Sequence, residues 1–249
     1  MNTAELLVTV AEKEQEIQDK IAEMDNALGE AVLGGSADGK TINELWWDVH
    51  TYNNERNGYL YGFAYADFTP LGGFNPPYQI KVKGTGSHTF HSCRGIGVLR
   101  AKDIDFSECT DFTYMCDRAG ITEIELIDTR ASNALNGLFN QNNYTVTVHK
   151  LILKEDGSQT FSKGAFESAY KMNNITFEGA IGADIWFTYS PLNLKSLQSV
   201  IKALKNYKDT GTTHTVMFSD SSISLLSDAE KAKAIDKGWT ILNKSGQAV

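Results

Sequence analysis

Residues 165–177, AFESAYKMNNITF, carry a pattern of apolar residues that recurs fifty-one residues earlier in MCDRAGITEIEL. The offsets of six, nine and eleven residues are shared by Phe166, Met172, Ile175 and Phe177 in the later copy and by Met115, Ile121, Ile124 and Leu126 in the earlier one. A repeat of this length predicts a solenoid, in which each unit buries its apolar face only against its neighbours. Such a fold favours a binding or scaffolding protein.

Short β-like runs alternate with loops from about residue 78 onward. They centre on residues 80–82, 104–106, 124–126, 151–153, 175–177, 216–218 and 241–242. The steps of 20, 27 and 24 residues between the runs that begin at 104, 124, 151 and 175 are close to the roughly 20–29 residues of leucine-rich repeats. Phe139 precedes Val148 by nine residues rather than six, which indicates an insertion in the third unit. After residue 175 the period stretches to 41 residues.

Two helices are predicted near the C-terminus. Residues 192–207 have apolar side chains at helical spacing, and Pro191 suits the first turn of that helix. Residues 227–237 form a second short helix that Gly238 ends, and residues 239–242 then provide the last strand. Long, atypical units of this kind are expected where a solenoid is capped.

Residues 4–28 follow a heptad pattern typical of a coiled coil. Its apolar positions are Leu7, Val10, Ile17, Ile21, Met24 and Leu28, and Glu14 takes the remaining place. About three heptads are marginal alone, because short helices need packing to persist. The pattern predicts an N-terminal helix that joins copies of the chain. The alternative is an amphipathic helix that lies on its own domain.

The sequence divides into an N-terminal helix over 1–30, a linker and capping region over 31–77, and a repeat domain over 78–249 with a helical C-terminal cap. Residues 29–40 are rich in glycine and small residues, as in a linker. Thr41 and Glu44 form a capping box. The aromatic-rich residues 46–78 then suggest a compact cap, with a carbohydrate-binding aromatic platform as the alternative.

The stretch AFESAYKMNNITFEG resembles the core A-F-x-x-x-x-x-L-x-x-I-x-I of the BspA-like leucine-rich repeats of bacteria and their phages. Ala165, Phe166, Ile175 and Phe177 match that core, and Met172 stands at its leucine position. In the earlier copy Tyr114 and Met115 replace the Ala-Phe pair. The segments ELLVTVAE, ELWWDVHTY, HKLILKEDGSQTF and ITFEGAIG, which begin at residues 5, 44, 149 and 175, are similar to leucine-rich-repeat proteins of phages and prophages of gut Firmicutes.

This resemblance implies an α+β fold in which an N-terminal coiled-coil-like helix precedes an irregular leucine-rich-repeat solenoid with short parallel strands. It also implies a non-enzymatic virion structural protein, tail-associated or a surface fibre, that binds a host-surface glycan or protein and contacts other virion proteins. A homotrimer formed through the N-terminal helix is the simplest assembly. The alternatives are a capsid decoration or head-fibre protein, or a bacterial cell-surface adhesion module. The resemblance transfers no catalytic, cofactor or metal residues.

The formal net charge of −8 argues against nucleic acid or an anionic membrane as the main partner, since both need clustered basic residues. No run of about 18 apolar residues occurs, so no membrane-spanning helix is expected. The N-terminus lacks the pattern of a signal peptide. These features fit a protein made in the host cytoplasm and located in the virion.

Several short motifs have a structural explanation that we prefer. GGSADGKT at 34–41 fits a phosphate-binding loop, but a polar heptad helix precedes it instead of a buried strand. If the segment with His88, His91 and Cys93 is extended, the two histidines face opposite sides, and no fourth metal ligand is evident.

The remaining polar motifs are also expected to be structural. The carboxylates of Asp103 and Asp105, and of Glu123 and Glu125, are expected on the exposed polar half of a repeat rather than as a glycosidase pair. Asp156-Gly157 predicts a turn. The three cysteines, Cys93, Cys109 and Cys116, are expected as small buried thiols.

Overall fold

The computed structural model describes Trp47 and residues 63–249. The chain divides into two compact units, Met1–Val49 and His50–Val249. Over its described residues, the second unit has an α+β fold with mostly short parallel strands and few helices. That much of the expected fold class is confirmed. The predicted helix over 1–30 and most of the capping region lie outside the described residues.

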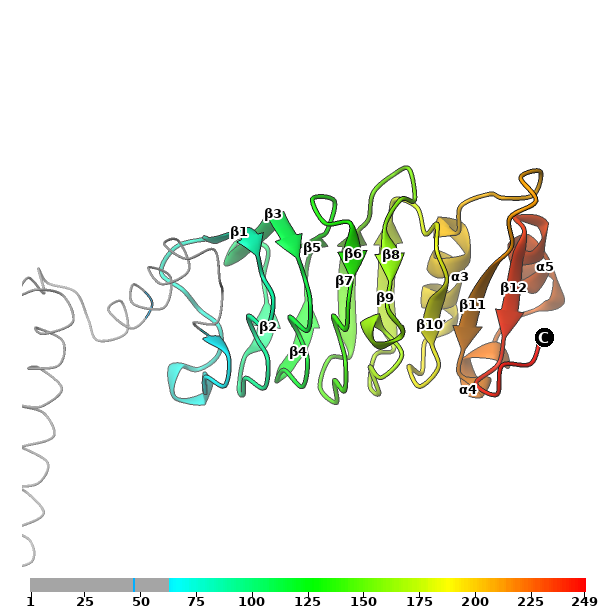
Figure 1. The fold of residues 1–249 in the computed structure, drawn as a ribbon. Coiled ribbons are helices and arrows are strands. Elements are labelled where there is room, and N and C mark those ends of the chain that lie inside the picture. Colours follow the sequence, from blue (N-terminus) through cyan, green and yellow to red (C-terminus); the bar gives the residue numbers. More distant parts are fainter. Residues whose placement is uncertain (1–46, 48–62) are drawn as a thin grey trace, which may run out of the picture. The chain divides into compact units, whose positions relative to one another are not determined.

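The strands follow one another along the chain with helices concentrated near its end (Figure 1). The strands are β1 (Ile80–Thr85), β2 (Gly97–Leu99), β3 (Ile104–Asp111), β4 (Ile121–Ile124), β5 (Ile127–Asp128), β6 (Ala134–Leu135), β7 (Thr147–Ile152), β8 (Thr160–Phe161), β9 (Asn174–Glu178), β10 (Ile185–Phe187), β11 (His214–Phe218) and β12 (Trp239–Leu242). The helices are η2 (Thr69–Leu71), η3 (Lys163–Ala165), α3 (Leu194–Ala203), α4 (Asp220–Ile223) and α5 (Asp228–Asp236).

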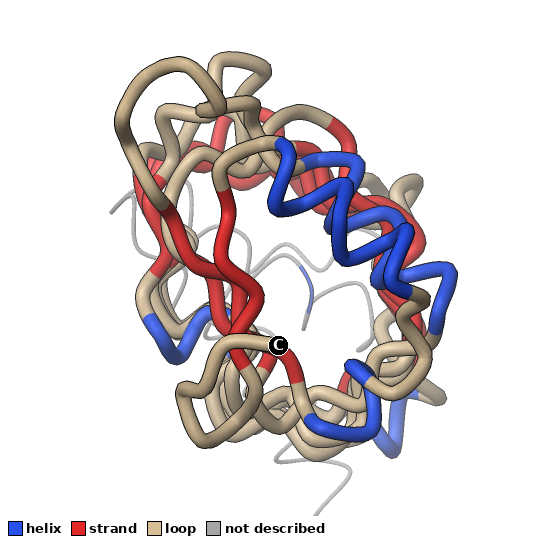
Figure 2. Tube along the Cα trace, turned by 90° about the vertical axis from the view of Figure 1, so that its right-hand side faces the viewer, coloured by secondary structure: helices blue, strands red, loops and turns tan. Residues whose placement is uncertain are grey.

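Each strand pairs in parallel with a strand one turn of the chain away. Ile80 pairs with Ile104 on β1 and β3, Ile124 pairs with Val148 on β4 and β7, and Val148 pairs with Ile175 on β9. One five-stranded sheet contains β2, β4, β5, β7 and β9, and smaller sheets join β1 to β3, β6 to β8 and β10 to β11 and β12. Each turn therefore contributes to more than one sheet, so the end-on view shows strands on different sides of a ring (Figure 2).

Two of the expected steps join residues of different sheets, and the steps from 124 to 151 and from 151 to 175 are out of register, because Leu151 pairs with Ile127 and Phe177. Ile104 and Ile124 are not equivalent, because Ile104 pairs with Ile80, whereas Ile124 pairs with Leu99 and Val148. The long step from 175 to 216 likewise joins residues of different sheets, and the unpredicted strand β10 is the true neighbour of β11. Within each sheet, the number of residues between paired positions on neighbouring strands varies less than the sequence indicated.

The repeat seen in the sequence is correct at its centre and shifted at its ends. Ile124 and Ile175 occupy equivalent positions through Val148. Leu126 does not match Phe177, because Phe177 pairs with Leu151, which in turn pairs with Ile127. The chain bends after β4 and displaces the register by one residue, which leaves Leu126 half-buried and Ile127 fully buried.

The start of the repeat is displaced as well. The amide of Cys116 donates to Leu138 O, and the amide of Phe139 donates to Ala165 O. Phe166 is therefore equivalent to Phe139 and Cys116 rather than to Met115.

The expected insertion between Phe139 and Val148 is also wrong. Nine residues separate this pair, and nine also separate their equivalents Phe166 and Ile175. The extra residue lies further on, between Val148 and Leu151, where the pairing of β7 with β9 shifts register.

A column of phenylalanine rings runs through the core. Adjacent ring centroids are 5.9 Å apart for Phe139 and Phe166, 5.2 Å apart for Phe166 and Phe187, and 5.8 Å apart for Phe187 and Phe218. Each buried ring removes a large apolar area from water, and close ring pairs add a further contribution. Between Phe139 and the phenylalanines earlier in the chain, this column is occupied by Cys116, which has no ring.

Four further rings close the column toward the N-terminal side. Phe63 stacks on Phe90 with centroids 5.9 Å apart, and Phe68 and Phe74 pack against Phe63. All four are buried. The described part of the aromatic-rich region thus fills a core with its phenylalanines, whereas Tyr65 and Tyr78 stay exposed.

Helix α3 lies where another strand would pair with β9. The Ser196 hydroxyl accepts from the Ile175 amide, and the Ser199 hydroxyl accepts from the Phe177 amide, both at 2.9 Å. These hydroxyls satisfy amides of the edge strand that a further strand would otherwise pair with. The predicted helix is confirmed, but Pro191 precedes it and Asn193 is its N-cap.

Helix α5 confirms the second predicted helix and supports the first. A capping box between Ser227 and Glu230 begins it, and Gly238 follows it with a φ of 86°, as a helix end requires. The Lys237 ammonium donates to the carbonyls of Ile201, Lys202 and Leu204 at 2.8–2.9 Å. This cation caps the C-terminal end of α3, where the helix dipole is negative.

The C-terminal tail covers the free edge of β12. The Val249 amide donates to Ile241 O at 3.1 Å, and the Asn243 amide donates to Gln247 O at 2.9 Å. Leu242 forms an antiparallel bridge with Ala248. Because an exposed edge strand invites pairing with another chain, this return of the tail protects the last sheet.

Candidate functional site

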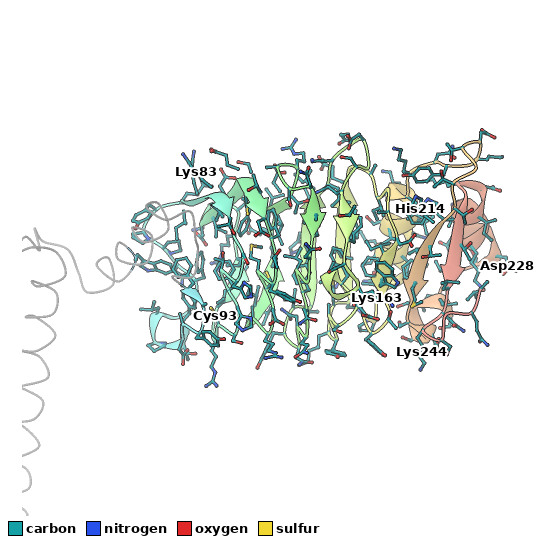
Figure 3. All side chains as sticks on the ribbon, in the orientation of Figure 1. Lys83, Cys93, Lys163, His214, Asp228 and Lys244 are labelled. Atoms are coloured by element: carbon teal, nitrogen blue, oxygen red, sulfur yellow. The ribbon has the colours of Figure 1, made fainter. Side chains whose placement is uncertain are left out.

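The turns that follow β1, β3, β6, β8 and β10 lie side by side at one edge of residues 63–249, the lower edge in Figure 1. In Figure 3, Cys93 and Lys163 belong to two of these turns and lie in the lower half, opposite Lys83. Five tyrosines on these turns and on the segment before them are 40–73% exposed. They are Tyr65, Tyr114, Tyr144, Tyr170 and Tyr189, and we call them the tyrosine edge.

The backbone of these turns is fixed by hydrogen bonds between neighbours. The Tyr114 amide donates to Asn136 O at 2.9 Å, the Tyr170 amide to Asn142 O at 3.0 Å, and the Tyr189 amide to Glu167 O at 3.0 Å. Backbone bonding therefore holds these residues in place while their rings stay exposed.

Two of the tyrosines have a backbone conformation that L-residues rarely adopt. Tyr65 has a φ of 65° and Tyr114 a φ of 51°, and such a position costs about 1 kcal/mol or more for a residue with a side chain. Gly137 takes the position equivalent to Tyr114 in the next turn, with a φ of 62°, and has no such cost. Position 114 therefore holds a tyrosine although its backbone conformation favours glycine.

The ring of Tyr114 lies over Gly137. A Cβ atom on Gly137 would come within 2.5 Å of Tyr114 Cε1, so the glycine makes room for the ring. Other rings meet along the edge: Tyr65 contacts His91 with centroids 5.1 Å apart, and Tyr170 contacts Tyr189 with centroids 6.1 Å apart. The rings thus form small groups whose outer surfaces are exposed.

Planar polar side chains lie between these groups of rings. His91 Nδ1 is 2.8 Å from Asp117 Oδ2, close enough for an ion pair although not aligned as a hydrogen bond. Asp117 Oδ1 accepts from Asn140 Nδ2 at 3.0 Å, and Arg118 Nε donates to Gln141 Oε1 at 2.8 Å. Polar side chains such as Arg118 and Gln141 therefore stand exposed among the aromatic surfaces, while the buried Asp117 holds its neighbours His91 and Asn140 in place.

The histidines of the SHTFHSC segment do not behave as the sequence suggested. The segment is a turn in which His88 has a φ of 59°, so His88 and His91 lie on the same side, with ring centroids 5.4 Å apart. Cys93 is buried, and its thiol donates to Phe63 O. Within the described residues, no three metal-ligating side chains gather at one place.

The cysteines are buried free thiols, as expected. Burial raises the pKa of Cys93 and of Cys109 to about 12 and raises the pKa of Cys116 as well. Because the thiolate is the reactive form, burial keeps these side chains in the less reactive thiol form, packed in the core.

The four carboxylates weighed as catalytic pairs are held separately. Asp103 is buried rather than exposed, 3.6 Å from Arg100 Nη1. Glu123 contacts His149 at 2.6 Å, and Glu125 accepts from the Ala101 amide. The Asp105 side chain accepts from the Ser107 amide. Each carboxylate thus has its own local partner.

The predicted turn at Asp156-Gly157 is confirmed. Gly157 has a φ of 66°, and the Asp156 side chain accepts from the Ser158 amide at 2.9 Å.

A shallow groove of about 450 Å³ separates α3 from α5. Its polar groups already serve structure, since Gln198 donates to Glu230 and Lys237 caps α3. The groove is therefore a weaker candidate than the tyrosine edge.

Two sequence motifs lie outside the described residues: the phosphate-loop match at 34–41 and the predicted oligomerisation positions. The latter are Leu7, Val10, Ile17, Ile21, Met24 and Leu28. Within the described range, no helix is long and apolar enough to cross a membrane.

Comparisons of the chain with protein-family models, with curated proteins and with solved structures found no match.

Proposed function

We propose that this chain is a non-enzymatic structural protein of a phage virion, tail-associated or part of a surface fibre. In this proposal the parallel strands belong to an irregular, BspA-like leucine-rich-repeat solenoid, which presents the tyrosine edge to the host surface. The similarity of residues 165–177 to those repeats supports the fold. The regular parallel pairing of successive turns is compatible with it.

The concentration of exposed tyrosines is the observation that carries a binding role. The structure describes seven tyrosines, and five of them are exposed on one edge. Tyrosine supplies a large, rigid and amphipathic contact area at low entropic cost, so it is enriched at recognition surfaces.

Immunogold labelling tests the virion role. An antibody raised against residues 63–249 should label particles released from a strain that carries the gene, with gold on the tail or its fibres. Gold on the head would favour the capsid decoration or head-fibre alternative. Protein on the bacterial surface and none on particles would favour the adhesion module and contradict the proposal.

Self-association through residues 4–28 completes the proposal, with a trimer as the simplest assembly. Deleting these residues should reduce the mass measured by multi-angle light scattering to that of one chain. Circular dichroism should show that the shortened chain is still folded. An unchanged oligomeric mass would show that the heptad positions do not join the copies.

A further inference from the structure

We propose that the tyrosine edge binds a linear, uncharged oligosaccharide that lies across successive turns. This inference rests on the proposed host-binding function and names the chemical class of its ligand. It begins from the exposed rings of this edge and from the planar polar groups that lie among them.

A pyranose ring has an apolar face and a polar rim, and this edge offers both aromatic and hydrogen-bonding side chains to contact them. Its axial C–H groups form an apolar face that packs on an aromatic ring, and its hydroxyls donate and accept hydrogen bonds at the rim. Tyr114 and Tyr189 provide exposed ring surface. Asn140 and Gln141 lie on a turn between them, where Asn140 donates to the buried Asp117 and Gln141 accepts from Arg118.

The register of the turns favours a linear chain. Inter-turn backbone bonds place Tyr65 beside Ser92, Ser92 beside Arg118 and Arg118 beside Gln141, and the sequence of turns continues to Tyr189. Adjacent strands lie about 4.8 Å apart, and one β-linked hexopyranose advances its chain by a similar distance. The five steps from Tyr65 to Tyr189 therefore span roughly 24 Å, which a hexasaccharide would cover.

The charges of the edge favour a neutral ligand. The charges of these turns and of the segment before them are mixed, with Arg94, Arg118, Lys163 and Lys171 set among Asp67 and Glu167, and the whole chain carries a formal charge of −8. These scattered cations, interrupted by carboxylates, give a polyanionic polymer no continuous basic track. An uncharged sugar meets hydrogen-bonding groups of both kinds without that cost.

Isothermal titration calorimetry of the full chain with cellohexaose, chitohexaose and maltohexaose tests the inference. At least one β-linked hexasaccharide should bind saturably, and maltohexaose, which is helical and α-linked, should bind more weakly. Tyr114→Gly and Tyr189→Ala should each weaken binding about tenfold, equivalent to about 1.4 kcal/mol. Tyr114→Gly suits the backbone, because glycine already occupies the equivalent position 137.

Tyr78→Ala is the matched control, because Tyr78 is exposed but lies outside the tyrosine edge. Its affinity should equal that of the unaltered protein. The inference is overturned if none of the three sugars binds at millimolar concentration. It is also overturned if Tyr114→Gly, Tyr189→Ala and the control Tyr78→Ala all bind with the same affinity.

Host envelopes separate this inference from the proposed function. Periodate cleaves vicinal diols, which a glucan has and a 1,4-linked N-acetylhexosamine chain lacks, so oxidised envelopes should no longer retain a protein that binds a glucan, whereas protease-treated envelopes should retain it for either glycan. If the tyrosine variants lose binding and protease treatment abolishes retention, the ligand is a protein. The glycan inference then fails while the host-binding function stands.

Discussion

At the scale of single residues, Phe166 is the centre of the aromatic core. Its ring lies 5.2–6.2 Å from the rings of Phe139, Phe161, Phe177 and Phe187, and its side chain is fully buried. No single smaller residue could replace these contacts, because the neighbouring turns are held by their own backbone bonds.

Phe166→Ala should therefore lower the free energy of unfolding by about 3–5 kcal/mol, since it removes buried apolar area and leaves a cavity. Urea denaturation measures the change. Tyr170→Ala, four residues along and exposed, should change stability by less than about 0.5 kcal/mol. A loss below about 1 kcal/mol for Phe166→Ala would contradict its place in the core.

The buried thiols predict a specific alkaline lability. Burial raises the pKa of Cys109 from 9.0 to about 12, so the folded state keeps a proton that the unfolded state loses. The resulting stabilisation is complete below pH 9 and is lost as the pH rises toward 12, at about 1.4 kcal/mol per pH unit for each thiol.

Cys109→Ala should remove one such contribution. The difference in unfolding free energy between the unaltered protein and this variant should shrink by about 1 kcal/mol between pH 9, where the unfolded thiol is half ionised, and pH 10. Urea denaturation of both proteins at pH 8, 9 and 10 measures this difference. Contributions from other groups that titrate in this range are common to both proteins and cancel. A difference that stays constant over these three pH values would show that the thiol is not buried.

At the scale of elements, the C-terminal helices depend on each other through one lysine. Lys237 donates to three carbonyls at the end of α3. Lys237→Met keeps the length of the side chain but leaves these carbonyls without that partner, so it should cost about 2 kcal/mol of stability. Lys233→Met, on the exposed side of α5, is the control and should be nearly neutral in thermal unfolding. Equal effects of both substitutions would contradict the capping role.

The helices and the short strands differ in how well they could be predicted from the sequence. Both helices were predictable, because α3 has apolar residues at helical spacing and α5 has a capping box at Ser227 and Glu230. The strands β2, β5, β6, β8 and β10 were missed, because two or three residues are too few to show alternation. Their absence made Ile104 and Ile124 look equivalent, although they belong to different sheets.

The tyrosine edge was missed for a related reason. Its five residues lie at unequal intervals along the chain and share no motif. Only the register of the turns brings them to one edge. The signal available in the sequence was indirect: tyrosines that stand outside every apolar run, in a chain whose phenylalanines lie mostly within the core.

At the scale of the described part of the molecule, the sheets end in a strand that the chain's own tail covers. Removing residues 245–249 should free the edge of β12, because Val249 and Gln247 supply its backbone partners. Light scattering should then detect association that grows with protein concentration. Lys244→Ala breaks the 3.1 Å ion pair with Asp220 but keeps the tail, so it should not associate. Unchanged mass after the deletion would show that the edge is protected in another way.

Because the inter-turn hydrogen bonds of the tyrosine edge come from the backbone, they constrain the side chains there only weakly. Along one row of equivalent positions the turns carry Tyr65, Ser92, Arg118 and Gln141, and the row ends at Tyr189. A tyrosine codon becomes a serine, histidine, asparagine or aspartate codon by a single base change. A lineage can therefore change the chemistry of this surface one mutation at a time with each intermediate still folded, and under the proposed host-binding function, sequence diversity should accumulate at these positions before it reaches the phenylalanine column.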